Sequence, residues 1–431
     1  MFSTSQHHHS SWSWIPTLYF AQGLPYVIVM TTAVIMFKRM GISNTDIALY
    51  TSWLYLPWVI KPLWSPVVEL FKTKRWWIIV MQIIIGAGLA GIALTINGPL
   101  AFRYSLAFMW LLAFSSATHD IAADGFYMLA LDEKKQAYFV GIRNTFYRLA
   151  VIAGQGILVM IAGILEQHFL TKMPEPVAIP QAWSISFYIL SVIFCLLFMY
   201  HHFILPRPAS DQVHLSQAQG DIKNIFRQFI GTFSDFFRKP HIIPALSYIL
   251  LYRFAESQLV KIASPFLLDH PSTGGLGLST SEVGFIYGTI GVIALTTGGI
   301  LGGILMARKG LSSCLWWMTI AMNLPNLVYI YLSVCQPRNI FLISGSVTIE
   351  QFGYGLGFTS LTYFMMLFSA GKYQTAHYAI CTGFMAAGMM LPGMFSGWIQ
   401  EQIGYQNFFI WVMLCTIPSF WTTQVIQNIT R

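Results

Sequence analysis

Long apolar segments recur along this chain, and short polar turns separate them. Each segment is long enough to cross a bilayer, because about 20 apolar residues in a helix span the roughly 30 Å of hydrocarbon. The pattern predicts twelve transmembrane helices with no soluble domain of useful size between them. The predicted spans lie near residues 14–37, 46–69, 76–97, 101–131, 138–165, 181–205, 241–268, 281–307, 312–334, 339–369, 372–400 and 404–428.

The longest polar segment, residues 206–240, falls in the middle of this pattern and is long enough to link two bundles. A basic turn followed by a tryptophan pair occurs once on each side of it, at Trp76–Trp77 and at Trp316–Trp317, as expected for a duplicated bundle. We therefore predict an all-α membrane protein. Its parts are an N-terminal six-helix bundle (1–205), a cytoplasmic linker (206–240) and a C-terminal six-helix bundle (241–431).

Composition indicates that the chain lies in a membrane, and the distribution of charge indicates its orientation there. Only 9% of the residues are charged and 55% are hydrophobic, whereas soluble domains have roughly 25% charged residues. The net charge is nevertheless +8. Most loop lysines and arginines fall in alternate loops, and the other loops hold only Lys38, Arg39, Arg103, Lys172 and Arg338. Since cytoplasmic loops are enriched in cations, we expect both termini in the cytoplasm and no nucleic-acid partner.

Two aspartates within the fourth predicted span are the first candidates for chemistry. They lie in "SSATHDIAADGFYMLA", where Asp120 and Asp124 are four residues apart and share one helix face. Two carboxylates this close can share a proton, which suits proton coupling. The alternative is that both are permanently paired with Lys61, Arg143 or Arg148. Lys61 and Asp124 lie at similar depth from the inner ends of their helices, so these two could pair.

The fifth predicted span supplies candidate substrate-binding residues. Arg143 and Tyr147 share one helix face, and Asn144 and Arg148 share another. Because a guanidinium suits carboxylates, we expect Arg143, Arg148 and Tyr147 to bind substrate together with Lys61.

The seventh and tenth predicted spans also carry charges. Arg253 and Glu256 are three residues apart and can pair on one helix face, either structurally or in substrate binding and proton coupling. Glu350 and Gln351, in the glycine-rich stretch "EQFGYGLGF", are expected to line a cavity. Lys261 is near the outer end of its span and is expected to extend its amine toward the interface.

Charged residues at helix ends are candidates for gating, and a glycine pattern predicts close helix packing. Glu69, Arg75 and Arg308 are candidate gating residues at the inner helix ends. In "TTGGILGGILMA", Gly298 and Gly302 have the small-residue spacing that lets two helices approach closely.

Known motifs for catalysis or metal binding do not occur. The sequence holds no H-E-x-x-H, no G-x-S-x-G and no cysteine cluster. We therefore expect no enzyme activity, no cofactor and no metal site. A sensor would normally add a soluble signalling domain, for which residues 206–240 are too short.

Several runs of the sequence resemble the AmpG family of muropeptide permeases, within the major facilitator superfamily. They include "KPLWSPVVELF", "SATHDIAADGFYMLALD", "LLYRFAESQL" and "YFMMLFSAGKYQTAHYAI". The resemblance covers most of the chain. It implies that Lys61 matches the family's lysine before a Leu-Trp-Ser-Pro element, although Pro62 intervenes here, and that Asp120 and Asp124 match its acidic pair. It also places Tyr147 and Arg148 on a Tyr-Arg-Leu element.

The acid that the family carries on its seventh helix, usually Asp, falls on Glu256, while Arg143 and Arg253 have no counterpart in the pattern. The resemblance implies proton-coupled import of anhydromuropeptides or related amino-sugar fragments across a bacterial inner membrane, by a monomer in lipid. Acetyl-coenzyme A transporters look like distant relatives, so a carrier for a sugar or another anionic solute is the alternative.

Overall fold

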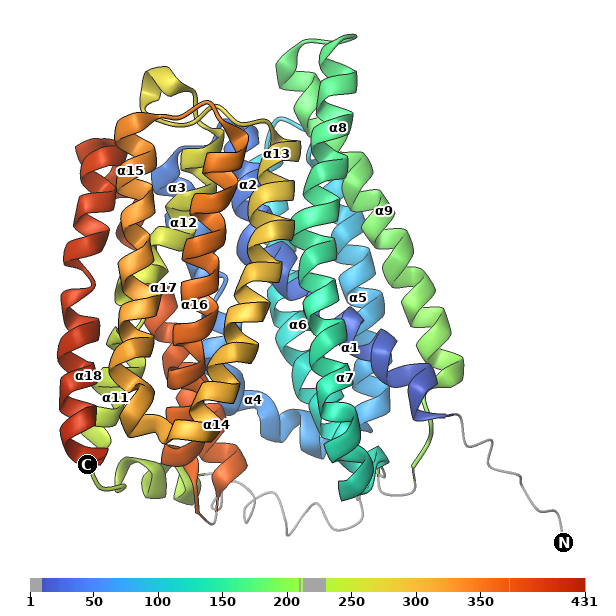
Figure 1. Cartoon of the computed structure of the whole chain (residues 1–431). Coiled ribbons are helices and arrows are strands. Elements are labelled where there is room, and N and C mark those ends of the chain that lie inside the picture. Colours follow the sequence, from blue (N-terminus) through green and yellow to red (C-terminus); the bar gives the residue numbers. More distant parts are fainter. Residues whose placement is uncertain (1–9, 209–210, 212–229, 372, 431) are drawn as a thin grey trace, which may run out of the picture.

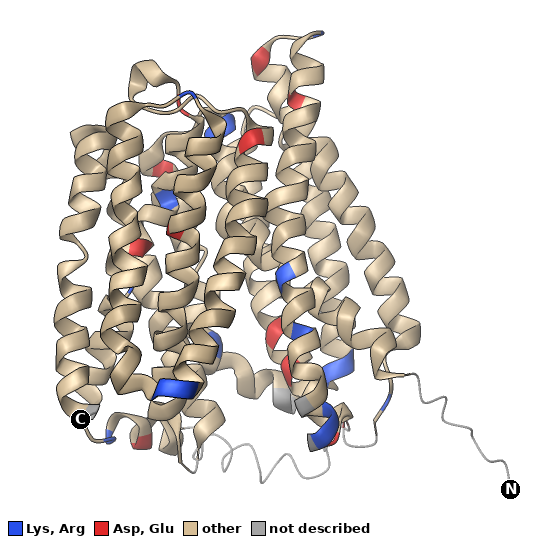
Figure 2. Ribbon diagram, viewed as in Figure 1, with Lys and Arg blue, Asp and Glu red and all other residues tan. Residues whose placement is uncertain are grey.

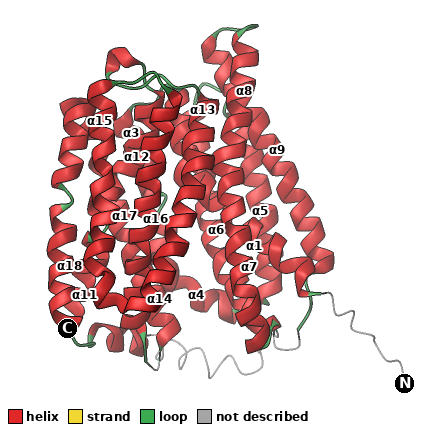
Figure 3. Ribbon diagram, in the orientation of Figure 1, coloured by secondary structure: helices red, strands yellow, loops and turns green. Residues whose placement is uncertain are grey.

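The computed structural model describes residues 10–208, 211, 230–371 and 373–430, without the side chains of a few helical residues such as Glu69. All regular secondary structure in this part of the chain is helical (Figure 3), which confirms the predicted all-α class. Most of the predicted linker, residues 209–210 and 212–229, lies outside the described residues.

The helices of the first half of the chain begin at Ser11 and end at Ile204. They include two π-helical segments, η1 and η2, each of which continues a flanking α-helix. In order they are α1 (Ser11–Val27), η1 (Ile28–Thr32), α2 (Ala33–Arg39), α3 (Asn44–Trp53), α4 (Leu56–Leu70), α5 (Lys74–Thr95), α6 (Ala101–Ala130), α7 (Glu133–Val151), η2 (Ile152–Ile157), α8 (Leu158–Leu170) and α9 (Glu175–Ile204).

The helices of the second half also include a π-helical segment, η4, and two short 3-10 turns, η3 and η5. They are α11 (Ile242–Leu251), α12 (Phe254–Leu268), η3 (Pro271–Thr273), α13 (Thr280–Phe285), η4 (Ile286–Gly291), α14 (Val292–Asn323), η5 (Leu324–Asn326), α15 (Leu327–Cys335), α16 (Ile340–Ser369), α17 (Gln374–Leu414) and α18 (Ile417–Thr430).

The helix order is consistent with the twelve predicted spans. Among the described residues, 7 helical runs are long and apolar enough to cross a membrane. Two of these runs contain a glycine with a left-handed backbone, Gly310 (φ 74°) in α14 and Gly404 (φ 76°) in α17, so each is two helices joined at a sharp bend. The chain is therefore a multi-pass membrane protein.

Polar side chains in the connections define where several helices begin. The hydroxyls of Ser43 and Thr73 accept hydrogen bonds from the backbone N–H groups of Asp46 and Trp76, at 3.0 and 3.1 Å, at the starts of α3 and α5. Each such cap satisfies a backbone donor that the first helical turn leaves free.

Close helix packing depends on glycines that the sequence identified. A Cβ on Gly298 of α14 would lie 2.1 Å from the carbonyl oxygen of Phe352 in α16, and one on Gly302 would lie 2.9 Å from that of Leu356. A Cβ on Gly355 of α16 would likewise lie 2.0 Å from the carbonyl oxygen of Leu295 in α14. The expected small-residue contact is thus confirmed for Gly298 and Gly302.

Two π-helical segments meet where the first and second halves of the chain touch. A Cβ on Gly156 of η2 would lie 2.5 Å from Oγ1 of Thr289, and one on Gly288 of η4 would lie 2.1 Å from the carbonyl oxygen of Gln155. π-Helical turns are uncommon and occur often at functional positions. Here they bring the backbones of η2 and η4 into direct contact.

Figure 1 shows the helices standing side by side, with α9 on one flank and α18 on the opposite flank. The described chain begins and ends at the same end of this bundle, which we call the terminal end. The opposite end, which carries the connections α2–α3, α8–α9 and α12–α13, is called the distal end. Gly404 lies there too, since it lines one pocket together with Gly41 and Thr273.

Candidate functional site

Charged residues occur along the lengths of the helices as well as at their ends (Figure 2). The pair Lys61–Asp120 is one case. Nζ of Lys61, on α4, lies 3.2 Å from Oδ2 of Asp120, on α6, and the two side chains keep 26% and 19% of their exposure. The pair is therefore formed between two helices and is only partly buried by the protein.

Asp124 lies one helical turn further along α6 and has different partners. Its Oδ1 accepts a hydrogen bond from the hydroxyl of Tyr19, on α1, at 3.1 Å and lies 3.7 Å from NH1 of Arg143, on α7. Arg143 also donates to the Tyr19 hydroxyl at 3.0 Å. Its guanidinium lies 4.9 Å from the ring centre of Tyr19 and 5.0 Å from that of Tyr127. Three helices thus hold one carboxylate, one guanidinium and one phenol together.

The pair between Lys61 and Asp124 that similar depth allowed is not formed, because Lys61 contacts Asp120 instead. Depth counted from helix ends neglects helix tilt and the bends that Pro62 and Pro66 favour within α4. A displacement of one turn, about 5.4 Å, is enough to exchange one aspartate for the other.

Tyr147 and Arg148 lie on α7, which packs against α1. A Cβ on Gly23 of α1 would lie 3.0 Å from the carbonyl oxygen of Tyr147 and 3.1 Å from its ring. Arg148 is half-buried, and no carboxylate among the described residues is within ion-pair distance of it. It is thus a cation without a protein counter-ion near the two paired aspartates.

A second group of charges belongs to α12 and α16. Arg253 lies at the break between α11 and α12 and donates a hydrogen bond to the hydroxyl of Tyr354. Its guanidinium also lies 5.1 Å from the ring centre of Tyr354 and 4.9 Å from that of Phe358. These contacts turn the arginine toward α16.

The expected pair between Arg253 and Glu256 is not formed among the described residues. The i, i+3 argument assumes a continuous helix, but α11 ends at Leu251 and α12 begins at Phe254. Glu256 is buried in the first turn of α12, and its Oε2 has no hydrogen-bond partner in the described part of the chain.

Glu350 and Gln351 are buried together on α16. The Glu350 carboxylate accepts hydrogen bonds from the Tyr329 hydroxyl at 3.3 Å and from the Gln351 amide at 3.0 Å. In the described residues no lysine or arginine pairs with it. Glu350 is thus a buried carboxylate among neutral donors. Glu256 likewise forms no ion pair with a described lysine or arginine.

The residues expected to act in gating lie apart from these clusters. Arg75 donates to the backbone carbonyls of Leu205 (3.2 Å) and His202, so it ties the start of α5 to the end of α9. Arg308 is exposed two residues before the bend at Gly310. The side chain of Glu69 lies outside the described residues. The gating roles stay predictions.

Lys261 corrects another expectation. Its side chain does not reach toward the interface: the residue is 1% exposed. Nζ donates to the hydroxyl of Thr51, on α3, at 2.9 Å and lies 5.1 Å from the ring centre of Tyr55. Proximity to a span end suggested snorkelling, but packing of α3 against α12 covers the amine.

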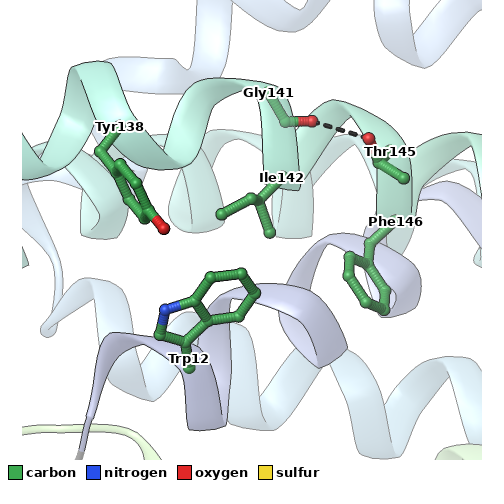
Figure 4. Close-up of a pocket in the computed structure, with 6 residues that line it drawn as sticks. All are labelled: Trp12, Tyr138, Gly141, Ile142, Thr145 and Phe146. Atoms are coloured by element: carbon green, nitrogen blue, oxygen red, sulfur yellow. Dashed lines mark hydrogen bonds between the residues drawn. The ribbon is translucent and has the colours of Figure 1, made fainter.

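A cavity of about 530 Å³ lies between α1 and α7 near the terminal end. Figure 4 shows Trp12 of α1 facing Tyr138, Ile142 and Phe146 of α7, while the hydroxyl of Thr145 bonds the Gly141 carbonyl on the same helix. None of the predicted site residues lines it. The charged clusters, and not this aromatic cavity, are therefore the candidate functional site.

Sequence reasoning missed two residues with clear roles in the geometry. Tyr19 joins Asp124 to Arg143, yet a tyrosine in an apolar span carries no sequence signal. Glu166 was expected beyond the end of its span, but it is 2% exposed within α8 and pairs with Arg39 at 3.0 Å. Arg39 is one of the few cations in its set of loops, and that scarcity could have pointed to an acidic partner.

Comparisons with known proteins agree on one kind of protein. The family model described as Major Facilitator Superfamily matches residues 17–391. The "Putative transporter AmpG 4" of Rickettsia conorii (strain ATCC VR-613 / Malish 7) is 26% identical over 417 residues, which cover 94% of each chain. The "Anhydromuropeptide permease" of Escherichia coli (strain K12) is 23% identical over 408 residues, or 93% of this chain and 76% of that one.

Solved structures share the fold. The crystal structure of a bacterial homolog to the human lysosomal transporter Spinster superposes with a TM-score of 0.68 at 15% identity, and the match covers 97% of this chain and 96% of that one.

Proposed function

Because this chain belongs to the Major Facilitator Superfamily, we propose that it imports a polar solute together with protons by alternating access. It is a transporter related to AmpG permeases and not an enzyme, so its substrate is a small solute and its surroundings are lipid. We propose a monomer in a bacterial inner membrane, with the terminal end in the cytoplasm, as the distribution of loop cations favours. Residues 206–240 then join two six-helix bundles.

The observation that supports proton coupling most directly is that both aspartates of α6 contact basic side chains. Asp120 is paired with Lys61 and Asp124 with Arg143, and both pairs are only partly buried. Protonation of either carboxylate removes its negative charge and weakens the pair. The released lysine or arginine can then bind a carboxylate of the solute. A proton and an anionic solute therefore bind more easily together than alone, which is the requirement for symport.

Other residues contribute to this scheme. Arg148 supplies a further cation, which no described carboxylate pairs with, and Tyr147 precedes it on α7. Glu256 is a third proton acceptor, since it is buried and its Oε2 has no hydrogen-bond partner among the described residues. We assign Arg253, at the start of α12, and Glu350 and Gln351, on α16, to substrate binding as well, with aromatic rings such as Tyr354 available to stack on sugar faces.

The substrate class is the finer part of the proposal. The relative from Escherichia coli is named an anhydromuropeptide permease, and muropeptides combine sugar rings with peptide carboxylates. That combination matches the aromatic and cationic residues described above. We propose anhydromuropeptides or related amino-sugar fragments as the solute, with a sugar or an acetyl-coenzyme A-like anion as the second candidate.

Uptake into proteoliposomes tests both parts. Labelled 1,6-anhydro-N-acetylmuramyl peptide, a labelled disaccharide and labelled acetyl-coenzyme A are offered with and without an inward proton gradient. We expect gradient-driven uptake of the muropeptide, and loss of that uptake in Asp120→Asn and Asp124→Asn. Glu175→Gln, which removes an exposed carboxylate at the distal end, is the control and should behave as the parent protein. If every transported solute enters at the same rate with and without the proton gradient, proton coupling is excluded.

A further inference from the structure

Polar side chains join the first and second halves of the chain at the distal end of the bundle. Among the described residues, hydrogen bonds and an ion pair join residues 10–208 to residues 241–430. On the first side they come from α2, α3 and α8. On the second side they come from α12, α13, α17 and Asp269, which follows α12. These cross-contacts thus favour closure of one end of the bundle.

Glu166 is the centre of one group of contacts. Its buried carboxylate accepts hydrogen bonds from Arg39 at 3.0 Å, from the Trp183 indole at 2.8 Å and from the Thr280 hydroxyl at 2.6 Å. Arg39 and Trp183 belong to the first half of the chain, whereas Thr280 begins α13 in the second half. The Thr280–Glu166 bond therefore joins the halves, and the other two bonds hold the carboxylate in position for it.

Asp269 is the centre of the other group. Its carboxylate lies 2.8 Å from Nζ of Lys38 and accepts a hydrogen bond from the Tyr405 hydroxyl at 2.5 Å. The Asn44 amide donates to Gln400 at 2.6 Å and to Tyr405 at 3.0 Å. Of the ion pairs among the described residues, Lys38–Asp269 alone links the first half to the second.

Lys261 opposes closure at the same contact between the two halves of the chain, which we call the seam. Its side chain is buried, its amine contacts Thr51 and Tyr55 of the other half, and no described carboxylate lies within ion-pair distance. An ammonium that is removed from water without an acidic partner is costly. When α3 and α12 separate, this amine regains water, so its burial opposes closure.

We propose that the Thr280–Glu166 and Lys38–Asp269 contacts are two latches that hold the distal end closed, and that Lys261 opposes them. This inference rests on the alternating access proposed above. In the state in which the distal end opens, both latches break and Lys261 is hydrated. The three contacts set the fraction of time for which the distal end is open, whichever solute is carried.

Cysteine accessibility in nanodiscs, where both ends of the protein meet solvent, tests this proposal. The reporter is Ser52→Cys in a variant that lacks the five native cysteines. Ser52 is fully buried between α3 and α17, since its Oγ lies 2.9 Å from the position of a Cβ on Gly393. A hydrophilic maleimide should reach this position only when the seam opens.

Thr280→Val and Asp269→Asn should each raise the labelling rate by about tenfold, the population change that corresponds to about 1.4 kcal/mol. Lys261→Met should lower it. Thr280→Val leaves Glu166 with Arg39 and Trp183, so the fold is kept even where Glu166→Gln fails to fold. Glu175→Gln is the matched control and should label as the parent protein.

Lys172→Cys, at an exposed distal position, verifies that the reagent is active in every sample. Parent-like labelling of Ser52→Cys in both Thr280→Val and Asp269→Asn overturns the latch proposal, as does a complete lack of labelling in all variants. The readout involves neither solute nor protons. A failure of the proposed substrate or of proton coupling would therefore appear in the uptake assay and leave this result unchanged.

Discussion

A single methyl group at Gly397 should shift the protein toward a state with an open distal end. Gly397, on α17, packs directly on the start of α3. A Cβ there would lie 1.8 Å from the carbonyl oxygen of Asn44, 2.3 Å from its carbonyl carbon and 2.7 Å from the backbone nitrogen of Thr45. All three are backbone atoms, so no side-chain rotation makes room. In Gly397→Ala the two helices must move apart before the methyl fits.

The magnitude follows from the cost of overpacking. An extra methyl in a well-packed contact costs about 1–3 kcal/mol. In the alternating access proposed above the halves separate where α3 and α17 touch, so the open state does not bear that cost. A difference of about 1–3 kcal/mol changes the ratio of the two states roughly 5–150-fold. A modest substitution should therefore produce a large change in the populations.

Distances between spin labels provide the assay. One label replaces Lys172 and the other replaces Thr273, which are exposed distal positions in the first and second halves of the chain. We expect Gly397→Ala to populate longer distances than the parent protein. Gly345→Ala is the control, because a Cβ on that glycine meets nothing within 4 Å. A lower unfolding temperature of Gly397→Ala with an unchanged distance distribution would refute the conformational reasoning.

Three further predictions follow from the packing and from the charged clusters. Gly298→Ala should lose about 1–3 kcal/mol of stability in thermal unfolding, because its methyl meets the α16 backbone, whereas Gly303→Ala faces open space and should not; equal stabilities would contradict the packing argument. The substitutions Lys61→Ala and Asp120→Ala should be non-additive in uptake assays by about 0.5–3 kcal/mol, as expected for side chains in contact, and additive losses would exclude a functional pair. Tyr19→Phe removes a hydroxyl that bonds both Asp124 and Arg143 and should weaken gradient-driven uptake, whereas the exposed Tyr188→Phe should not; parent-like uptake by both variants would remove Tyr19 from the site.

Helical spacing predicted the relative position of Asp120 and Asp124 but not that of Arg253 and Glu256. Asp120 and Asp124 are four residues apart, and that interval already places them on one face of a helix with one turn between them. The same reasoning failed for Arg253 and Glu256, because it assumes an unbroken helix. The break at Tyr252 and Arg253 has no glycine or proline at those two positions to announce it. Local spacing is therefore reliable only within a continuous helix.

Burial was harder to anticipate than position. Lys261 and Glu166 both lie near the ends of their predicted spans, where long polar side chains usually reach water. In the structure other helices cover both: α3 packs over Lys261, while α9 and α13 donate hydrogen bonds to Glu166. Which neighbour covers a helix end is a property of the packed bundle, and no pattern within one helix contains it.

The sequence by itself determined that the chain is helical and crosses a membrane repeatedly, because hydropathy and span length depend on one segment at a time. It also determined the shared face of Asp120 and Asp124 and the close packing at Gly298 and Gly302. Only the tertiary structure decided that Lys61 pairs with Asp120, that Tyr19 and Arg143 hold Asp124, and that Thr280 reaches Glu166. These contacts join helices far apart in sequence, and their geometry depends on tilts, bends and breaks of several ångströms, whereas a hydrogen bond tolerates only a few tenths.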